Sequence, residues 1–529
     1  MNKIKEFFTR LIERFLESIK RFLLANIFLA IIALILVICI IIEDFGDLYM
    51  HLTIASTLGG LTSFVLTLAT EKYNLKKGNI INIVVSISVA IITYVVFHFF
   101  SENTYVFLGY MGLLTVEMCI SFYLMYFIED NKKLFAILVS SLLYCYVMVT
   151  TIVVGLSICL LAFQTLIYDF KDIGKVYLII VTVCEVFVAN SLFLSYIPTI
   201  DEQLTITKAY ENILHKATLA VYYVLVGILY LYLAKVLITF EMPINRINWF
   251  ASFALLFYCL FYLSCQNNEK GLALFHVKYG GYVMIPILLM QSYALFLRIN
   301  AYGLTTPRYL SIMFNLIGLA FVVSSFFRKG PKYVFLFIAV LAVVLSVGPF
   351  NIIDVPFKSQ TRRMEKILIK NDMLDGKTII ANPNISDEDK KEIREIYYYL
   401  KYSDSDKENY LTAITENEFE TVFGFKNYVY NDVNKDYKYC SYTNSNSVID
   451  IEGYKSMEFV DYRDSFEIEG YNIKDYCWSL YNSYGESQKT ELIYLADDGT
   501  KIVFASINFT IKDETEITGV YLSCYILRK

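Results

Sequence analysis

The sequence predicts an α-helical polytopic membrane bundle of about eleven transmembrane helices, followed by a C-terminal α+β water-soluble domain. Its 529 residues are 56% hydrophobic and 18% charged, with a mean hydropathy of +0.49, whereas soluble proteins average about 45–50% apolar and about 25% charged residues. The charge is divided unevenly, since residues 1–357 carry 24 Lys and Arg against 20 Asp and Glu, and residues 358–529 carry 22 against 31. A wholly soluble or disordered chain is therefore excluded, and we expect three regions, 1–21, 22–350 and 351–529.

Residues 1–21 are predicted to form an amphipathic interfacial helix. Apolar side chains from Ile4 to Phe22 recur at helical spacing, and six Lys and Arg fall largely between them. A helix with this pattern lies in the headgroup region of a membrane; an ordinary basic flank before the first span is the alternative. The apolar run 22–42 follows, and because no small-residue cleavage site succeeds it, we interpret it as an uncleaved first span.

Ten further apolar runs complete a set of eleven candidate spans. Crossing a hydrocarbon core of about 30 Å takes about 20 apolar residues in a helix. The run 134–168 is too long for one upright span and too short for two, so we expect one tilted helix there. The other nine runs lie at roughly 50–70, 79–100, 104–128, 176–197, 217–239, 248–265, 281–298, 309–327 and 332–349.

The orientation follows from the Lys and Arg content of short loops, because cytoplasmic loops carry the excess. The N-terminal segment holds six, loop 71–78 holds three and loop 129–133 holds two, whereas loops 43–49 and 101–103 hold none. The N-terminus is therefore predicted to be cytoplasmic. Eleven spans then place residues 351–529 outside the cytoplasm; splitting the run 134–168 into two spans would reverse that placement.

The water-facing region is predicted to begin with two helices and to continue as a mainly antiparallel sheet. The helices are expected at 359–372 and from Ser386 to about Tyr402, where Ser386–Asp389 resembles a capping box. After them the pattern changes to a period of two and to β-forming residues, and Asp498–Gly499 is a strong hairpin signal. The candidate strands are 447–451, 456–460, 465–469, 491–496, 501–511 and 518–527.

Two carboxylates inside the spans are the first candidate functional residues. Glu117 and Glu185 each lie near the middle of a predicted span, where an ionised side chain is costly. We expect both to be neutral, or hydrogen-bonded to hydroxyl groups of neighbouring spans. A proton or cation path is the alternative interpretation.

The second candidate is an interfacial patch at the boundary of two spans, formed by Arg298, Tyr302, Gly303, Thr305 and Arg308. Arg and Tyr are ordinary interfacial anchors, and the turn here also simply ends one helix and starts another. Arg side chains fork onto phosphate or carboxylate. We therefore expect the two arginines to bridge the outer membrane face to lipid phosphates or to the first helix of the outer domain.

The patch also carries a family resemblance. The stretch LRINAYGLTTPRYL (297–310), with GPF…SQTRRMEKIL (348–368), DGKTII and ISDEDKKEIREIYYYL, resembles the bacterial multi-pass membrane family catalogued as domain-of-unknown-function family 4153. The resemblance covers about residues 20–402. It implies a bacterial cytoplasmic membrane protein and supports the span count and the patch, but it implies no catalytic residue.

No catalytic or metal motif is apparent. All four histidines precede residue 357, and HExxH, GxxxxGK[ST] and paired CxxC motifs are absent. We predict no catalytic residue, metal site, cofactor or nucleic-acid partner. If the region is extracytoplasmic, two of the three cysteines Cys440, Cys477 and Cys524 could form one disulfide.

The function class stays open between three hypotheses, of which an enzyme is not the favoured one. The first is a cell-envelope anchor in contact with the lipid bilayer, whose residues 351–529 bind an envelope protein or polymer. The second is a secondary transporter that uses Glu117 and Glu185. The third is a membrane-embedded transferase on a lipid-linked substrate, for which Glu43, Asp44 and Asp47 are the acidic candidates.

Overall fold

The computed structural model describes residues 2–126, 133–166, 172–199, 210–239, 247–266, 270–327, 331–403, 409–427, 437–444, 449, 451–463, 466–468, 470–482, 492–496, 498–512 and 516–529. The chain divides into two compact units, Met1–Phe425 and Lys426–Lys529. The boundary expected at 350/351 marks the end of the apolar helices and falls inside the first unit, which also holds the first water-facing helices.

Nine helices in the described part of the chain are long and apolar enough to cross a bilayer. A multi-pass helical membrane region is thus confirmed. They are α2 (Leu23–Ile42), α3 (Asp47–Tyr73), α4 (Gly78–Phe100), α5 (Thr104–Tyr126), α6 (Leu134–Leu166), the continuous run α7 (Ile173–Thr182), η1 (Val183–Ala189) and α8 (Asn190–Ser195), the run η2 (Glu211–Thr218) and α10 (Leu219–Thr239), α12 (Gly271–Tyr302) and α13 (Thr306–Phe327).

Two further apolar helices are shorter, α11 (Ile247–Cys265) and α14 (Lys332–Ser346). They occupy the two remaining positions at which the sequence predicts spans. The long apolar run beginning at residue 134 forms one continuous helix, α6, as predicted.

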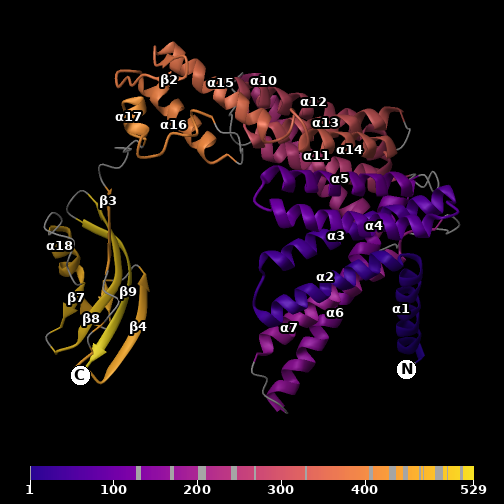
Figure 1. The fold of residues 1–529 in the computed structure, drawn as a ribbon, viewed down its shortest axis with the longest axis horizontal. Coiled ribbons are helices and arrows are strands. Elements are labelled where there is room, and N and C mark those ends of the chain that lie inside the picture. Colours follow the sequence, from indigo (N-terminus) through magenta and orange to yellow (C-terminus); the bar gives the residue numbers. More distant parts are fainter. Residues whose placement is uncertain are drawn as a thin grey trace. The chain divides into compact units, whose positions relative to one another are not determined.

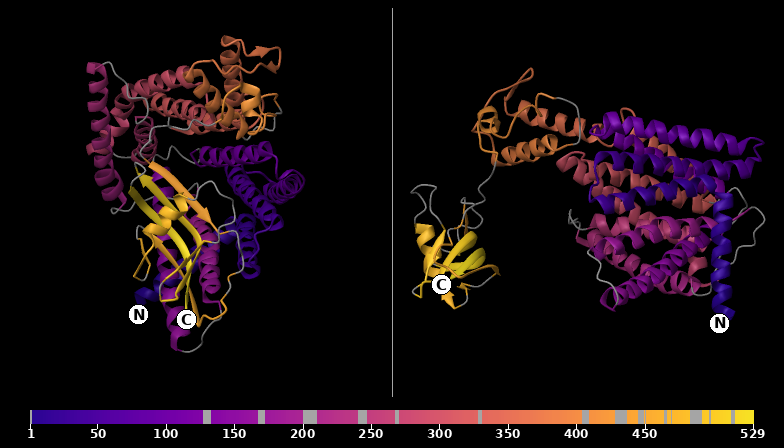
Figure 2. Two further views of the ribbon diagram at one scale, coloured as in Figure 1. Left: turned by 90° about the vertical axis from the view of Figure 1, so that its left-hand side faces the viewer. Right: turned by 60° about the horizontal axis from the view of Figure 1, so that its bottom comes forward.

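The N-terminal helix α1 (Asn2–Arg21) lies across one end of the bundle rather than along the spans (Figure 1, Figure 2). The chain bends after it because Phe22 leaves the helical conformation, with φ −114° and ψ 45°. Asn26 stabilises the bend by donating to the backbone oxygens of Ser18 at 3.2 Å and Phe22 at 3.0 Å. Arg21 then forms a two-pronged ion pair with Glu71 at the end of α3, both contacts at 2.8 Å.

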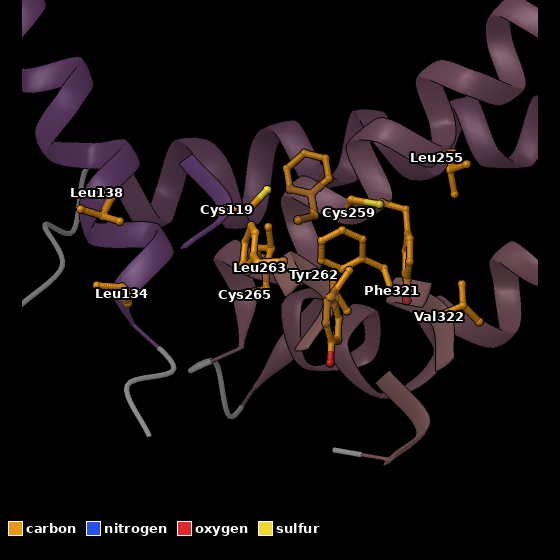
Figure 3. Close-up of a cluster of buried hydrophobic side chains, with 14 of the residues drawn as sticks. Cys119, Leu134, Leu138, Leu255, Cys259, Tyr262, Leu263, Cys265, Phe321 and Val322 are labelled. Atoms are coloured by element: carbon orange, nitrogen blue, oxygen red, sulfur yellow. The ribbon is translucent and has the colours of Figure 1, made fainter. Parts of the chain in front are cut away.

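The bundle core collects side chains from helices far apart in the sequence (Figure 3). Cys119 of α5, Leu138 of α6, Cys259 of α11 and Phe321 of α13 belong to one buried cluster. Helices approach closely where a glycine leaves room: a Cβ at Gly318 would stand 2.4 Å from a methyl carbon of Leu255. Small residues at such crossings let membrane helices pack by van der Waals contact.

Three helix ends meet where the spans end and α15 (Asp354–Lys370) begins. The hydroxyl group of Tyr105, at the start of α5, donates to Asp354 at 2.7 Å. The hydroxyl group of Tyr309, at the start of α13, donates to the backbone oxygen of Phe350 at 2.9 Å, just after α14. This end of the bundle is opposite the end that α1 crosses (Figure 1, Figure 2).

A small helical layer follows within the first unit. It contains α15, the hairpin β1 (Leu374–Asp375) and β2 (Thr378–Ile379), α16 (Asp387–Lys401) and α17 (Phe419–Phe423). Its core packs Met364 and Leu368 of α15 against Ile393 of α16 and Phe419 of α17. Ser386 caps α16 by accepting from the backbone N–H of Asp389 at 3.1 Å, so the predicted helix start is confirmed.

The second unit is an antiparallel sheet with one helix on one face. Its strand order is β3 (Tyr437–Thr443), β8 (Lys501–Lys512), β9 (Glu516–Arg528) and β4 (Ser456–Arg463), and β7 (Ile493–Leu495) also pairs with β8. Helix α18 (Lys474–Asn482) shares a buried cluster with this sheet through Cys477 and Leu480. The antiparallel sheet is thus confirmed.

Individual strand predictions have mixed outcomes. The strands expected at 456–460, 491–496, 501–511 and 518–527 are present as β4, β7, β8 and β9, and β7 and β8 form the expected hairpin at Gly499, whose φ is +86°. Of the strand expected at 465–469, the described residues 466–468 contain β5 (Glu467–Ile468), which pairs with β6 (Tyr471–Asn472). Residues 465 and 469 lie outside the described residues. The strand expected at 447–451 lies mostly outside the described residues, and Ile449 and Ile451 are not in strands.

The three cysteines of this unit are buried. Cys440 of β3 and Cys524 of β9 lie in the same apolar cluster as Cys477 of α18. These three described residues form no disulfide with one another. Burial as small apolar side chains accounts for their positions.

Candidate functional site

Glu117 lies on α5 and contacts α3. Its Oε1 is 2.7 Å from the hydroxyl oxygen of Thr62, which in turn is 2.8 Å from the backbone oxygen of Leu58. The hydroxyl group of Thr62 has one proton. It shares this proton between the two oxygens, or donates it to Leu58 alone when a protonated Glu117 donates to Thr62. The hydroxyl group is thus a partner for either form of the Glu117 carboxyl group.

Glu185 lies in the π-helical turn η1 and contacts α6. Its Oε1 accepts a hydrogen bond from Thr150 at 2.7 Å, and its Oε2 is buried without a hydrogen-bond partner among the described residues. The side-chain amide of Asn190 donates to the backbone oxygens of Glu185 at 3.1 Å and Val186 at 2.9 Å, which satisfies carbonyl groups within the wide turn. π-Helical turns occur frequently at functional sites.

The two carboxylates form separate polar sites. Glu117 bonds to α3 and Glu185 bonds to α6, so they share no hydrogen-bond partner. Within the described ranges, no group of three or more His, Cys, Asp or Glu side chains could hold a metal ion. The geometry therefore does not pair the two residues in a common acid–base mechanism.

The acidic side chains of the loop after the first span interact with groups close to them. Glu43 forms an ion pair with Lys175 at the start of α7, at 2.5 Å, and this contact lowers the pKa of the Glu43 carboxyl. Asp44 accepts a hydrogen bond from the backbone N–H of Gly46 at 2.9 Å, and Asp47 lies in the first turn of α3. Each of the three residues thus has a local structural role.

The interfacial patch is a tight turn between α12 and α13. Gly303 has φ +69°, a left-handed conformation that favours glycine. A Cβ there would also stand 2.8 Å from Nε2 of Gln360, so the turn needs glycine for conformation and for space. Thr305 contributes its backbone oxygen, which accepts from the N–H of Tyr309 at 2.9 Å as α13 begins.

Two guanidinium groups bind the carboxyl end of α12. Arg308 donates to the backbone oxygens of Tyr302 at 3.0 Å and Gly303 at 2.6 Å, and its guanidinium lies 5.5 Å from the centre of the Tyr302 ring. Arg363 of α15 donates to the backbone oxygens of Tyr302 at 2.7 Å and Ala301 at 3.1 Å. Cations are favoured at this end of a helix, where unpaired carbonyl groups carry partial negative charge.

Further contacts join α15 and α16 to the same turn. Gln360, which is only 1% exposed, donates to the backbone oxygens of Tyr302 at 3.1 Å and Leu304 at 3.0 Å. The hydroxyl oxygen of Tyr399 on α16 accepts from the backbone N–H of Thr306 at 3.1 Å. Helix α15 is thus joined to the turn by its own Gln360 and Arg363, whereas Arg308, which the sequence predicts as part of this bridge, binds its own turn.

Arg298 lies on α12, close enough to Arg308 to repel it electrostatically, as Arg363 does. The structure therefore brings Arg298, Tyr302, Gly303 and Arg308 together, and adds Gln360, Arg363 and Tyr399, which the sequence alone does not identify. A glutamine on the apolar face of the predicted helix, one turn before Met364, was the available signal. Its partners could not be inferred from it.

A cavity of about 340 Å³ separates parts of α15 and α16. It is lined by Arg363, Lys366, Ile367, Lys370, Glu388, Asp389 and Glu392. Two ion pairs, Lys370–Asp389 and Arg363–Glu392, both at 2.9 Å, join the helices across it. Burial opposes ionisation of Asp389, but hydrogen bonds with Lys370, Asn371 and Ser386 outweigh it and hold the pKa of Asp389 below its usual value.

His276 is a buried polar residue that the sequence analysis did not single out. Its ring on α12 is fully buried, with Nε2 3.3 Å from the backbone oxygen of Tyr258 and Nδ1 3.0 Å from the hydroxyl oxygen of Tyr223. Because the carbonyl oxygen can only accept, Nε2 donates to Tyr258; in the neutral ring Nδ1 then accepts from Tyr223. The histidine thus joins α10, α11 and α12.

No family model, curated protein or solved structure matches this chain. The resemblance to family 4153 therefore stays a prediction. The fold defines a class, a multi-pass membrane protein with a C-terminal α/β region that contains an antiparallel sheet.

Proposed function

We propose that this chain is a cell-envelope anchor whose membrane bundle holds the water-facing helices in place and whose C-terminal sheet binds an envelope protein or polymer. The main support for this proposal is the docking of α15 and α16 on the α12–α13 turn. Gln360, Arg363 and Tyr399 make five hydrogen bonds to the backbone of that turn. Such a connection fixes the segment that leads from the bundle to the sheet.

The helix ends that lie in contact with one another support eleven membrane crossings rather than nine. Helix α15 contacts the start of α5 through Asp354 and the end of α12 through Gln360, two residues that lie about 9 Å apart along a helix. If α11 crosses with the nine longer helices, those two ends fall on one membrane face. If α11 did not cross, they would fall on opposite faces, about 30 Å apart. The hydrogen bond from Tyr309, at the start of α13, to Phe350, just after α14, likewise supports a crossing by α14.

The proposed location is a bacterial cytoplasmic membrane, with the N-terminus in the cytoplasm and the sheet outside. The basic loops of the first spans support the orientation, and eleven crossings carry the chain to the other side. The position of α1 across the bundle end (Figure 1) supports its proposed role as an interfacial helix. Ile12 and Leu16 are exposed apolar side chains on it, which suits contact with lipid.

The candidate partner surface is the sheet face that α18 does not cover. Tyr439 of β3, Phe459 of β4 and Tyr521 of β9 are 67%, 52% and 48% exposed. The register places Ser441 beside Asn508 and Asp461 beside Ser523 between these aromatic rings. The unit carries 11 Lys and Arg against 17 Asp and Glu, so bulk charge disfavours a polyanionic partner.

A photo-crosslinking amino acid at position 459 tests the proposal in intact cells that express the full chain. We expect one dominant adduct, reduced at least severalfold by Tyr439→Ser and Tyr521→Ser together. Tyr402→Ser, which removes a similarly exposed tyrosine just after α16, should leave the adduct unchanged. Absence of any adduct from position 459, with normal amounts of folded protein, would contradict the proposal.

A secondary transporter is the second candidate, because Glu185 lies in a π-helical turn with one carboxyl oxygen unpartnered among the described residues. Proton flux into liposomes that contain the purified chain, driven by a potassium diffusion potential, tests it. A transporter predicts flux above that of empty liposomes and loss of that flux in Glu185→Gln. Flux equal to that of empty liposomes would exclude proton conduction by the chain in the absence of a co-substrate.

A further inference from the structure

At the turn between α12 and α13, two guanidinium groups donate to the same backbone oxygen. Nη1 of Arg308 and Nη1 of Arg363 lie 3.0 Å and 2.7 Å from the backbone oxygen of Tyr302. The two nitrogens are therefore separated by no more than the sum of these distances. Like charges at this separation repel, and in a partly buried site water screens them less than in bulk solution.

The surroundings compensate one of these charges but not the other. Arg363 forms an ion pair with Glu392 at 2.9 Å. Among the described residues, the guanidinium groups of Arg298 and Arg363 lie near Arg308, and no carboxylate forms a hydrogen bond or an ion pair with it. The end of α12 supplies only about half an elementary charge. Arg308 thus has two guanidinium groups near it and no carboxylate partner among the described residues.

Arg308 also has N–H groups that form no hydrogen bond with the described residues. An arginine offers five N–H groups in a planar fork, and among the described residues the hydrogen bonds of Arg308 all leave from Nη1. Its Nε and Nη2 remain available to a ligand. A planar fork with neighbouring arginines matches the geometry of phosphate oxygens.

We propose that Arg308, with Arg298 and Arg363 beside it, binds a phosphate group at the α12–α13 turn. The turn joins two membrane-spanning helices, so it lies at the depth where lipid headgroup phosphates are found. The bound phosphate neutralises the repulsion around Arg308 and thereby stabilises the docking of α15. The site does not depend on which partner the sheet unit binds.

Native mass spectrometry of the full-length chain tests this, with phosphatidylglycerol and with a phosphate-free diacyl glycolipid as probes. We expect phosphatidylglycerol to bind at least about tenfold more tightly than the glycolipid, because a charge-assisted bond is worth that factor or more. Arg308→Gln should remove this preference. Arg362→Gln is the matched control, since Arg362 is the exposed neighbour of Arg363 on α15, and should retain it.

Inorganic phosphate distinguishes the two sources of the ligand. If millimolar phosphate displaces phosphatidylglycerol, the site takes free phosphate as well; if it does not, a lipid headgroup is the ligand. Arg308→Lys keeps a charge without the fork, so it covers the case in which Arg308→Gln fails to fold, and should bind more weakly than the parent chain. Equal binding of both lipids by the parent chain, or an unchanged preference in a folded Arg308 variant, would overturn the proposal.

Discussion

Replacing Gln360 by alanine should release α15 from the bundle more often without unfolding either. Gln360 is nearly inaccessible to water and donates two hydrogen bonds, at 3.1 Å and 3.0 Å, to the backbone oxygens of Tyr302 and Leu304. Each such bond contributes about 0.5–1.5 kcal/mol net, so the two together are worth about 2 kcal/mol. The opened population of α15 should therefore rise about 30-fold, since each 1.4 kcal/mol is a factor of ten.

Hydrogen–deuterium exchange of the full chain in nanodiscs measures that opening in peptides from Asp354–Lys370. Arg362→Ala, two residues away on the exposed side of the same helix, is the control and should leave exchange within about twofold of the parent chain. Exchange in Gln360→Ala no faster than in this control would refute the argument that the turn holds α15.

Three other substitutions follow from the same geometry. Glu117→Gln should keep the fold because the amide can still donate to Thr62, whereas Glu117→Leu should lower the unfolding free energy by about 1–3 kcal/mol by removing the partner of a buried hydroxyl group, as measured by thermal unfolding in detergent. Gly303→Ala should destabilise the α12–α13 turn by about 1–2 kcal/mol or more, because its φ is +69° and its Cβ would meet Gln360; proteolysis near residues 350–360 should accelerate. The folded-state pKa of Asp389 is lowered, so its contribution is fully present above the unfolded value of 3.8 and disappears as pH falls below it; exchange of the α15–α16 layer should rise in that acidic window, and Asp389→Asn should remove the dependence.

Much of the architecture follows from properties that act locally. A span needs only length and hydropathy, so all eleven expected positions carry apolar helices. The cap at Ser386 and the turn at Gly499 depend on a few adjacent residues, and the sequence predicts them for that reason. Such features need no knowledge of distant neighbours.

The missed elements depend on tertiary context. Strand β3 was not predicted because, of its side chains whose burial is described, Cys440 is buried and Tyr442 partly buried, so its apolar alternation is weak. Helix α18 has nine residues, too few for a clear helical period. Short elements of this kind are stabilised by the sheet they cover rather than by their own pattern.

The sequence predicts where the α12–α13 turn lies but only some of the contacts that its residues make. The sequence identifies Arg308 and Gly303, because charge at a span boundary and glycine in a turn are local signals. It does not identify the carbonyl groups that Arg308 binds, since these become available only when Gly303 adopts its left-handed conformation. Arg363 lies about sixty residues further along the chain, so only the fold brings it to the same turn.

The most direct test of the anchor proposal is the side of the membrane on which α16 ends. Cysteines introduced one at a time by Ser403→Cys, just after α16, and Lys76→Cys, in the exposed loop after α3, can be labelled with a membrane-impermeant maleimide against the parent chain as background. We predict that the cysteine at 403 reacts in intact cells and that the one at 76 reacts only after permeabilisation. Reaction of both from the same side would contradict eleven crossings, and with them the extracytoplasmic anchor.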